Sequence, residues 1–264
     1  NFDAIIILGD RFEMLPAAYT AAMMNIKIVH LHGGEITLGA IDNKMRFAIS
    51  HLADLHITAT EQSKTRLLKC GFDPSTVFMT GALGVENALK MKKASRIEIE
   101  RKIGVKFCNK NILFTFHPET VSVKSVEEQI ECVLNSLGEF DGVGKFISMP
   151  NADPGNKIIR EKLTDFKKQH PNVYITHNLG HHLYLSLMNE VDAIVGNSSS
   201  GIIEAPAFSI ATVNIGNRQK GREFAESILQ CTYDSHTIKA ALSKALRDPI
   251  NFPLNKHPYY LRGT

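Results

Sequence analysis

Short apolar runs alternate with longer helical patterns along the whole chain, and this alternation restricts the fold more than any other feature. The runs expected to form strands are 3–8, 26–31, 55–60, 77–80, 112–116, 145–149, 173–176, 193–195 and 211–215. Helical patterns are expected at 12–24, 42–53, 61–70, 86–103, 125–137, 156–169, 183–189, 202–208 and 235–247. Strands that alternate with helices pair in parallel, because each helix carries the chain back to the edge where the next strand begins. The sequence therefore predicts an α/β protein with parallel sheets, and the unbroken apolar run 3–8 predicts a strand covered on both faces.

The polar stretch 104–111 has no clear periodicity and interrupts this pattern. We place a domain boundary there, with an N-terminal Rossmann-like domain at 1–106 and a C-terminal Rossmann-like domain at 107–264. In open parallel sheets, ligands bind beyond the carboxyl ends of the strands. Polar side chains follow those ends in both halves: Asp10, His32, Glu35, His117, Asn151 and Ser198. The sequence therefore predicts two Rossmann-like domains facing a cleft, with an active site inside it.

Composition excludes several classes of function. The net charge of +3 is small and no basic stripe with interleaved aromatics is present, so we expect no nucleic-acid partner. No apolar run reaches the roughly 18–20 residues of a membrane span, so we expect no membrane partner. The cysteines are far apart, without metal-ligand spacing, which argues against a zinc site and favours reduced thiols in the cytoplasm. We expect no metal and no cofactor, since this sequence also lacks the GxGxxG motif of nicotinamide sites.

The most informative stretch is 193–222, which holds the motif Asn-Ser-Ser-Ser-Gly at 197–201 between an expected strand and an expected helix. A loop of small residues at a helix N-terminus binds anions, because N–H groups, hydroxyls and the helix dipole point toward the ligand. Glu204 follows where a sugar attached to that anion would lie, and a carboxylate can accept two ribose hydroxyls. Arg218 and Arg222 follow the next strand and could close over the phosphates. The alternative is a solvated serine-rich turn that caps its helix.

This motif, together with Asn-Ile-Gly-Asn-Arg-Gln-Lys-Gly-Arg at 214–222, resembles the UDP-N-acetylglucosamine 2-epimerases. It is most similar to the hydrolysing branch that makes N-acetylmannosamine for sialic acid, and the resemblance extends over nearly the whole chain. It implies the two-domain glycosyltransferase-B arrangement, with Ser198, Ser199 and Ser200 on the UDP diphosphate, Glu204 on the ribose and Arg218 on the phosphates. The family also has an earlier strand with a Gly/Arg nucleotide loop and a C-terminal helix. Neither is in this sequence, so we expect the N-terminal domain to be incomplete.

The first half carries two more family motifs. Gly-Asp-Arg-Phe at 9–12 matches the motif in which the aspartate, here Asp10, is an acid/base or orienting carboxylate, and Arg11 would help to hold UDP. His-Leu-His-Gly-Gly-Glu at 30–35 matches the next motif, but many members carry Glu where His32 stands. Two interpretations stay open: Glu35 supplies the catalytic carboxylate, or His32 takes over the proton transfer.

Asp42 corresponds to a further catalytic carboxylate of the family. The family motif usually has a second acid beside it and a histidine after the arginine, whereas this chain has Asn43 and Phe47. Taken alone, Asp42 would be interpreted as a helix N-cap, because aspartate commonly accepts from the first N–H groups of a helix.

In the second half, His117 in Phe-His-Pro-Glu-Thr matches the family histidine that contacts the substrate or UDP, and Asn151 matches a UDP-contacting asparagine. Leu179 is expected beside the uracil by alignment. The nearby His177, His181 and His182 match no family position and are left as surface or supporting residues.

The resemblance implies that UDP is eliminated from a UDP-2-acetamido sugar and that water adds to the resulting glucal. The products would be UDP and N-acetylmannosamine, made by Asp10, Glu35, Asp42, His32 and His117. Three alternatives stay open: the same reaction on a diacetamido-trideoxy sugar nucleotide for legionaminic acid, a non-hydrolysing 2-epimerase, and a sugar-nucleotide-binding glycosyltransferase. The expected partners are the UDP-sugar substrate and further copies of the chain, in a dimer or tetramer.

Overall fold

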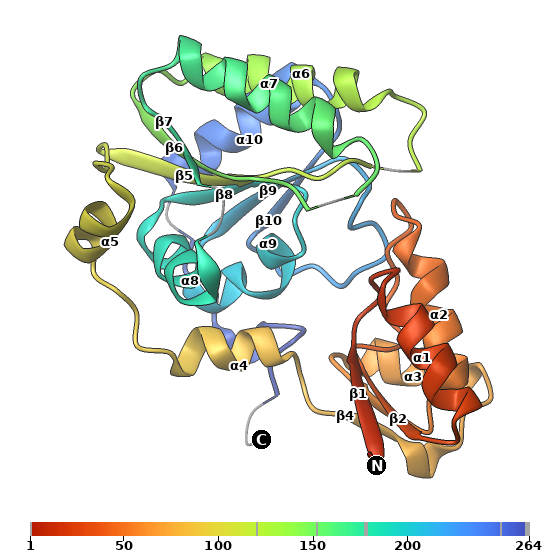
Figure 1. Cartoon of the computed structure of the whole chain (residues 1–264). Coiled ribbons are helices and arrows are strands. Elements are labelled where there is room, and N and C mark those ends of the chain that lie inside the picture. The colour runs from red at the N-terminus through yellow and green to blue at the C-terminus, as the bar shows by residue number, and fades with distance from the viewer. Residues whose placement is uncertain (1, 120, 152, 177–178, 249, 262–264) are drawn as a thin grey trace.

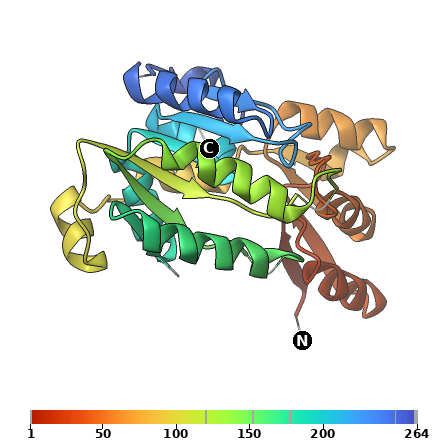
Figure 2. The same ribbon diagram turned by 90° about the horizontal axis from the view of Figure 1, so that it is seen from above.

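The described residues form two parallel sheets, which confirms the α/β class (Figure 1). The structure is a computed structural model that describes residues 2–119, 121–151, 153–176, 179–248 and 250–261. The first sheet has the order β1-β2-β3-β4, and the second has the order β10-β9-β8-β5-β6-β7. Figure 2 shows the first sheet and its helices beside the second sheet rather than stacked on it.

The first sheet consists of β1 (Ala4–Leu8), β2 (Lys27–Leu31), β3 (Leu55–Thr58) and β4 (Val77–Met79). The connecting helices are α1 (Met14–Met23), α2 (Asp42–Leu52) and α3 (Glu61–Lys69), with a 3-10 turn η1 at Pro74–Thr76. Ile7, Ile28 and Ile49 form a core with the alanines of α1, because small residues let the helix lie close to the strands.

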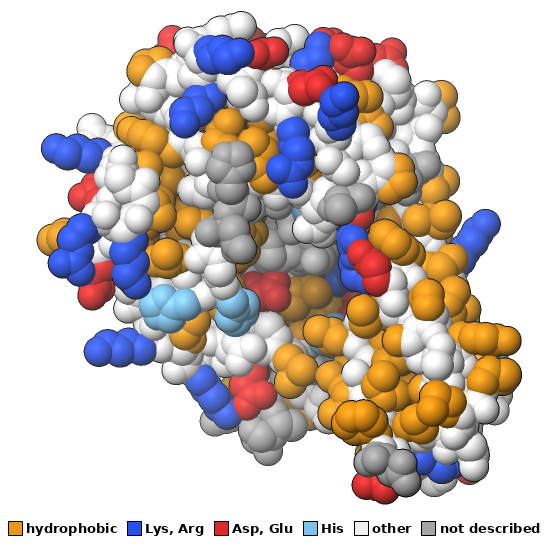
Figure 3. Space-filling model, in the orientation of Figure 1, with side chains coloured by type: hydrophobic (Ala, Val, Ile, Leu, Met, Phe, Trp, Pro, Cys, Tyr) orange, Lys and Arg blue, Asp and Glu red, His pale blue; other side chains and the backbone are white. Residues whose placement is uncertain are grey.

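The other face of β1 is not covered, so the expectation of a strand buried on both faces is wrong for the described residues. Side chains alternate between faces along a strand, and here Ile7 is buried while Ile6 and Leu8 are 68% and 54% exposed. The helices of this half cover the face that carries Ile7, and β1 is an edge strand. In Figure 3 the exposed apolar side chains form a continuous patch over this half of the molecule.

The second sheet consists of β5 (Lys110–Thr115), β6 (Val143–Ser148), β7 (Val173–Thr176), β8 (Ala193–Gly196), β9 (Ala211–Ile215) and β10 (Ile228–Cys231). β10 was not expected from the sequence. The helices α6 (Val126–Gly138), α7 (Asn156–Gln169) and α10 (Ser235–Arg247) cover one face, and α8 (Gly180–Glu190) and α9 (Ser200–Ile203) lie on the other. Two 3-10 turns, η2 and η3, span Ala205–Phe208 and Leu254–Lys256.

The single helix expected at 86–103 is wrong, because the structure has two helices, α4 (Leu83–Lys90) and α5 (Arg96–Ile103). Ser95 begins the second helix with a capping box in which its side chain and that of Glu98 satisfy each other's backbone N–H groups. The N–H of Ala94 donates to the Ser186 hydroxyl of α8 at 2.9 Å. Both helices share a core with the second sheet, through Ala88, Ile99 and Leu185 among others. The predicted domain boundary at 106/107 lies after them and stays a prediction.

Candidate active site

The carboxyl ends of the two sheets face each other across two adjoining cavities. The serine compartment has a volume of about 430 Å³ and is lined by residues such as Asp42, His117 and Ser198. The glutamate compartment has a volume of about 370 Å³ and is lined by residues such as His32, Glu35 and Glu204. The compartments share the lining residues Leu8, Gly9, Asp10, Ser199 and Arg222, so they are two parts of one cleft.

Nearly all of the site residues expected from the sequence line this cleft. The serine compartment contains Asp10, Arg11, Asp42, His117, Asn151, Ser198, Ser199, Ser200 and Arg218. The glutamate compartment contains His32, Glu35 and Glu204, and also His181. Leu179 lines neither compartment and packs against the core formed with α8, so the structure does not bring it to the site. His177 lies outside the described residues.

The serine loop follows β8 and is held by its neighbour β5. The side chain of Asn197 accepts a hydrogen bond from the N–H of His117 at 2.7 Å and donates one to the carbonyl of His117 at 2.8 Å. Gly196 has φ 128° and passes against the backbone of Thr115, where a side chain could not fit. The loop is therefore fixed by the strand that also carries His117.

The helix expected at 202–208 is wrong in its bounds and its length. α9 covers only Ser200–Ile203 and is followed by the 3-10 turn η2. Pro206 within η2 lacks an N–H, and Ser209 ends the turn in the left-handed conformation. Since the macrodipole grows from many aligned peptides, a single turn contributes little. The hydroxyls of the loop and the nearby arginines are the stronger features for anion binding.

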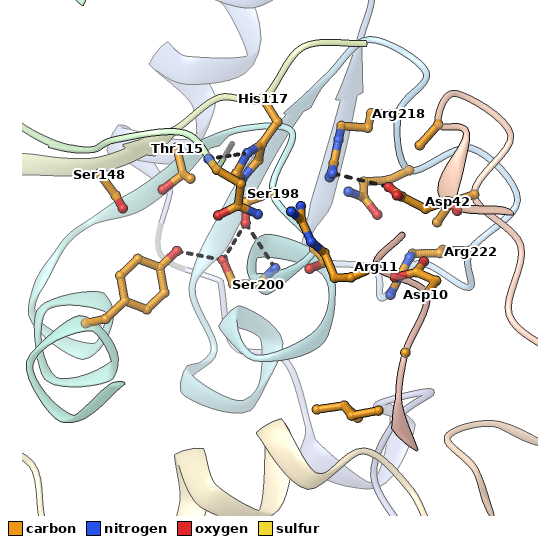
Figure 4. A pocket seen from close by; sticks show the side chains of 18 of the residues that line it. Asp10, Arg11, Asp42, Thr115, His117, Ser148, Ser198, Ser200, Arg218 and Arg222 are labelled. Carbon is orange, nitrogen blue, oxygen red and sulfur yellow. Dashed lines mark hydrogen bonds and ion pairs between the residues drawn. The ribbon is translucent and has the colours of Figure 1, made fainter. Parts of the chain in front are cut away.

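Three ion pairs link the two halves across the cleft. Arg11 contacts Asp153 at 2.6 Å, Arg218 lies 3.9 Å from Asp42, and Arg222 lies 2.7 Å from Glu35. In each pair the arginine and the carboxylate come from different halves of the chain. Figure 4 shows Arg11 and Arg218 between the serine loop and the two aspartates, Asp10 and Asp42. The serine compartment thus combines hydroxyl donors with three guanidinium groups, a set that suits a diphosphate.

Glu35 is paired on both of its oxygens. Its Oε1 lies 2.7 Å from Nδ1 of His32, and its Oε2 faces Arg222. Burial would raise the pKa of this 3% exposed carboxyl, but Arg222 and His32 outweigh burial and hold the pKa below its ordinary value. His32 has φ 62°, a strained conformation for a residue with a side chain, and such strain often occurs at functional sites. Glu35 is therefore a fixed negative charge, and His32 is the more exposed member of the pair.

Asp10 and Asp42 are the carboxylates of the serine compartment. Arg46, which is fully buried, contacts Asp10 and donates to the backbone carbonyl of Glu35 at 2.9 Å, so it fixes both motifs of the first half. Burial raises the pKa of Asp42 above its ordinary value, against the lowering effect of Arg218. A carboxylate with a raised pKa is a better proton acceptor when it is ionised.

His117 is neutral. Burial is the main cause that lowers its pKa to about 3, and the charges of Arg218 and Arg11 act in the same direction. Its Nδ1 accepts from the N–H of Asn151 at 3.4 Å, so the ring proton lies on Nε2. His117 can therefore donate a hydrogen bond into the serine compartment without carrying charge.

Glu204 is the principal carboxylate of the glutamate compartment. Burial raises its pKa to about 7, although His32 and Arg222 partly oppose this. Its Oε2 is enclosed and has no hydrogen-bond partner among the described residues. Gly84, at the start of α4, is next to this carboxylate, and a Cβ there would clash with Oε1. The absence of a side chain at residue 84 therefore keeps the space in front of Glu204 open.

Several lining residues were not identified from the sequence. Thr115 and Ser148 end β5 and β6, and their position at strand ends could have indicated them. Asp153 lines neither compartment and was also not identified from the sequence, although it contacts Arg11 and lies 3.8 Å from Arg218. Tyr184 lines the serine compartment from α8, where a helical tyrosine gives no sequence signal.

Comparison with known proteins decides the family. The family model described as "UDP-N-acetylglucosamine 2-epimerase" matches residues 1–264. The chain belongs to the UDP-N-acetylglucosamine 2-epimerase family. This confirms the resemblance that the motifs suggested.

Several curated relatives are similar in sequence to this family member. The polysialic acid biosynthesis protein P7 of Escherichia coli is 38% identical over 90% of this chain and 61% of its own length. The GDP/UDP-N,N'-diacetylbacillosamine 2-epimerase (hydrolyzing) of Campylobacter jejuni is 38% identical over 86% of this chain and 59% of its own length. A UDP-N,N'-diacetylbacillosamine 2-epimerase (hydrolyzing) of Legionella pneumophila is 36% identical over 94% of this chain and 65% of its own length. The chain thus spans about three-fifths of these relatives.

Solved structures confirm the fold. The UDP-GlcNAc 2-epimerase of Methanocaldococcus jannaschii, in complex with UDP-GlcNAc and UDP, matches with a TM-score of 0.78 at 16% identity, over 98% of this chain and 72% of that one. The Neisseria meningitidis enzyme bound to UDP-GlcNAc matches with a TM-score of 0.78 at 18% identity, with the same coverage. The predicted two-domain epimerase architecture is therefore confirmed. None of the helices in the described part of the chain is both long and apolar enough to cross a membrane.

Proposed function

We propose that this protein is a hydrolysing 2-epimerase of a UDP-2-acetamido sugar. The observation that supports this most is the shared cleft: a serine loop with three arginines and the carboxylates Asp10 and Asp42 line one compartment. A diphosphate on the loop would put its attached sugar within reach of these acids. The relatives whose names include "hydrolyzing", at 36–38% identity, support the hydrolysing branch over the non-hydrolysing one.

The reaction would begin with removal of the C2 proton by a carboxylate and departure of UDP from C1. The C1–O bond breaks with its electrons, a C1–C2 double bond forms, and the product is a 2-acetamidoglucal. Ser198, Arg11 and Arg218 would stabilise the departing diphosphate, as preorganised donors do for developing negative charge. We assign the proton acceptor to Asp42, because burial raises its pKa and so makes the ionised carboxylate a stronger base than an exposed aspartate.

Hydration completes the reaction. Water adds at C1 and a proton is delivered to the opposite face of C2, which gives the free manno-configured sugar. Neutral His117 can donate to a sugar or diphosphate oxygen through Nε2. The pair His32–Glu35 lies in the other compartment, and we assign proton transfer to His32, with Glu35 orienting it.

UDP-GlcNAc, giving N-acetylmannosamine, is our first choice of substrate. The second is UDP-N,N'-diacetylbacillosamine, favoured by the names of the Campylobacter and Legionella relatives. These sugars differ at C4 and C6, and the glycosidic bond and C2 chemistry are the same. A homo-oligomer, dimer or tetramer, stays a prediction, as does a cytoplasmic location.

Incubation with each UDP-sugar in deuterated water, followed by NMR, tests the proposal. The expected result is a free manno-configured sugar deuterated at C2, together with UDP. An epimerised UDP-sugar would identify a non-hydrolysing enzyme. UDP binding without turnover of either sugar, or transfer of the sugar to an added acceptor, would refute the epimerase proposal and favour a glycosyltransferase.

A further inference from the structure

The hydroxyl groups around the serine loop form a continuous chain that begins outside the loop, on α8. The phenolic oxygen of Tyr184 lies 2.6 Å from Oγ of Ser200, and Oγ of Ser200 lies 3.0 Å from Oγ of Ser198. The N–H of Ser200 also donates to Oγ of Ser198, at 3.4 Å. All three side chains line the serine compartment.

The polarity of this chain follows from the donor and acceptor capacity of each group. A hydroxyl has one proton to donate and two lone pairs. A phenol is a stronger acid than an aliphatic alcohol, so Tyr184 donates and Ser200 accepts. The proton of Ser200 is then directed to Ser198. Since Ser198 already accepts from both the N–H and the hydroxyl of Ser200, its own proton is the one left to donate to a ligand.

The ring of Tyr184 is well placed to hold this arrangement. It packs at the edge of the apolar core that includes Leu185 and Leu187, so the phenol has little freedom to turn away. Burial raises the pKa of Tyr184, which keeps the phenol protonated and able to donate at neutral pH. Oriented donors of this kind need no rearrangement when negative charge arrives.

We propose that Tyr184 is a positioning residue of the anion site: it donates to Ser200, directs Ser200 toward Ser198, and leaves the Ser198 proton aimed at a ligand phosphate. Tyr184 itself does not contact the ligand. The inference deepens the proposed function, because it takes the occupant of the serine loop to be the diphosphate of UDP.

The variant Tyr184→Phe removes only the phenolic oxygen, and isothermal titration with UDP and with uridine measures its effect. We expect UDP affinity to fall about tenfold, because without Tyr184 the Ser198 hydroxyl loses its directed hydrogen bond to the charged phosphate. Uridine, which has no phosphate, should bind as tightly as it does to the wild type. If Tyr184 only stabilised the fold, Tyr184→Phe would weaken the binding of UDP and of uridine by the same factor. The matched control is Tyr174→Phe on β7, whose ring packs on Phe146 and which lines neither compartment.

A double-variant cycle tests whether Tyr184 acts through Ser200. Ser200→Ala should weaken UDP binding at least as much as Tyr184→Phe, and the double variant should be no weaker than Ser200→Ala alone. Unchanged UDP affinity in Tyr184→Phe, as the opposite hydrogen-bond polarity predicts, would overturn the inference. The inference would also be overturned if the double variant lost UDP affinity by the product of the two single-variant losses, because Tyr184 and Ser200 would then act independently.

These outcomes separate the inference from the proposed function. UDP binding can be measured without turnover. If the variants show the expected binding pattern but the protein converts neither UDP-sugar, the epimerase proposal is refuted and the role of Tyr184 is supported. Conversely, full epimerase activity with wild-type UDP binding in Tyr184→Phe would remove the role of Tyr184 alone.

Discussion

The raised pKa of Glu204 has a measurable consequence for stability. The pKa is about 7 in the folded protein, against an ordinary value of 4.5, and burial is the main cause. The carboxyl therefore binds its proton more tightly when the chain is folded than when it is unfolded. The associated stability is fully present below about pH 4.5 and is lost as the pH rises through 7. Glu204→Gln keeps the shape of the side chain and removes the titration.

The size of the effect follows from the two pKa values. Each pKa unit corresponds to about 1.4 kcal/mol, so the ionised carboxylate of Glu204 costs at most about 3.5 kcal/mol of folding free energy at pH 8. The residue faces a cavity that water can enter, and we expect about 2 kcal/mol in practice. Glu204→Gln should therefore unfold at nearly the wild-type temperature at pH 5. At pH 8 it should unfold roughly 4–8 °C above the wild type, by the usual relation for a chain of this size.

Thermal unfolding of the wild type and Glu204→Gln from pH 5 to 8, without UDP, measures this difference. The contributions of all other titrating groups to the unfolding temperature cancel in this comparison, because both proteins contain those groups. Glu226→Gln is the control, since the side chain of Glu226 is 75% exposed. A Glu204→Gln variant whose advantage over the wild type does not grow with pH would refute the reasoning, and would mean that Glu204 has a partner or hydration that the burial argument ignores.

Three other substitutions probe the cleft. Asp10→Asn should lower turnover about 100-fold or more while UDP affinity stays near the wild-type value, because the family motif makes Asp10 an acid/base or orienting carboxylate and such a group contributes roughly 10²–10⁴-fold to rate. Wild-type-like turnover would show that Asp10 has neither role. Asp153→Asn should tighten UDP binding several-fold in a titration, because the charge of Asp153 competes with the diphosphate for Arg11 and Arg218. Weaker binding would mean that Asp153 is needed to orient the two arginines. Gly39→Val should weaken UDP binding and lower the melting temperature, because a side chain at residue 39 would clash with the backbone of Asn217 in the other half of the chain. A wild-type melting temperature would show that the backbones of the two halves can move apart at this contact.

The sequence was sufficient to predict that the polar residues after the strands meet, because parallel sheets place the carboxyl ends of all their strands at one edge. Asp10 and His32 follow β1 and β2, whereas His117 and Ser198 follow β5 and β8, and the four line one cleft. That outcome needed only the order of strands and helices. The exact length of each element did not affect it.

Tertiary contacts decided what the sequence did not predict. Residues 86–103 have an almost uninterrupted helical pattern, yet a hydrogen bond from Ala94 to Ser186 and the capping box at Ser95 divide them into two helices. The apolar run of β1 indicated burial on both faces, but a sequence does not state which elements are present to cover it. Tyr184 belongs to the site through a contact to Ser200 that no spacing rule contains.

The pair of Arg218 with Asp42 suggests why this phosphate ligand and this acid come from opposite halves of the chain. Without UDP, Arg218 lies near Asp42 and partly opposes the effect of burial on the Asp42 pKa. Under the proposed reaction, a diphosphate on the serine loop draws Arg218 toward itself, because it carries more charge than one carboxylate. Asp42 would then lose its partner, and this loss would raise its pKa further, so that it would become a stronger base only once a leaving group is in place. Arg222 is different, since its pair with the buried Glu35 is short and lies toward the other compartment, so that charge stays fixed while the serine compartment responds to the ligand.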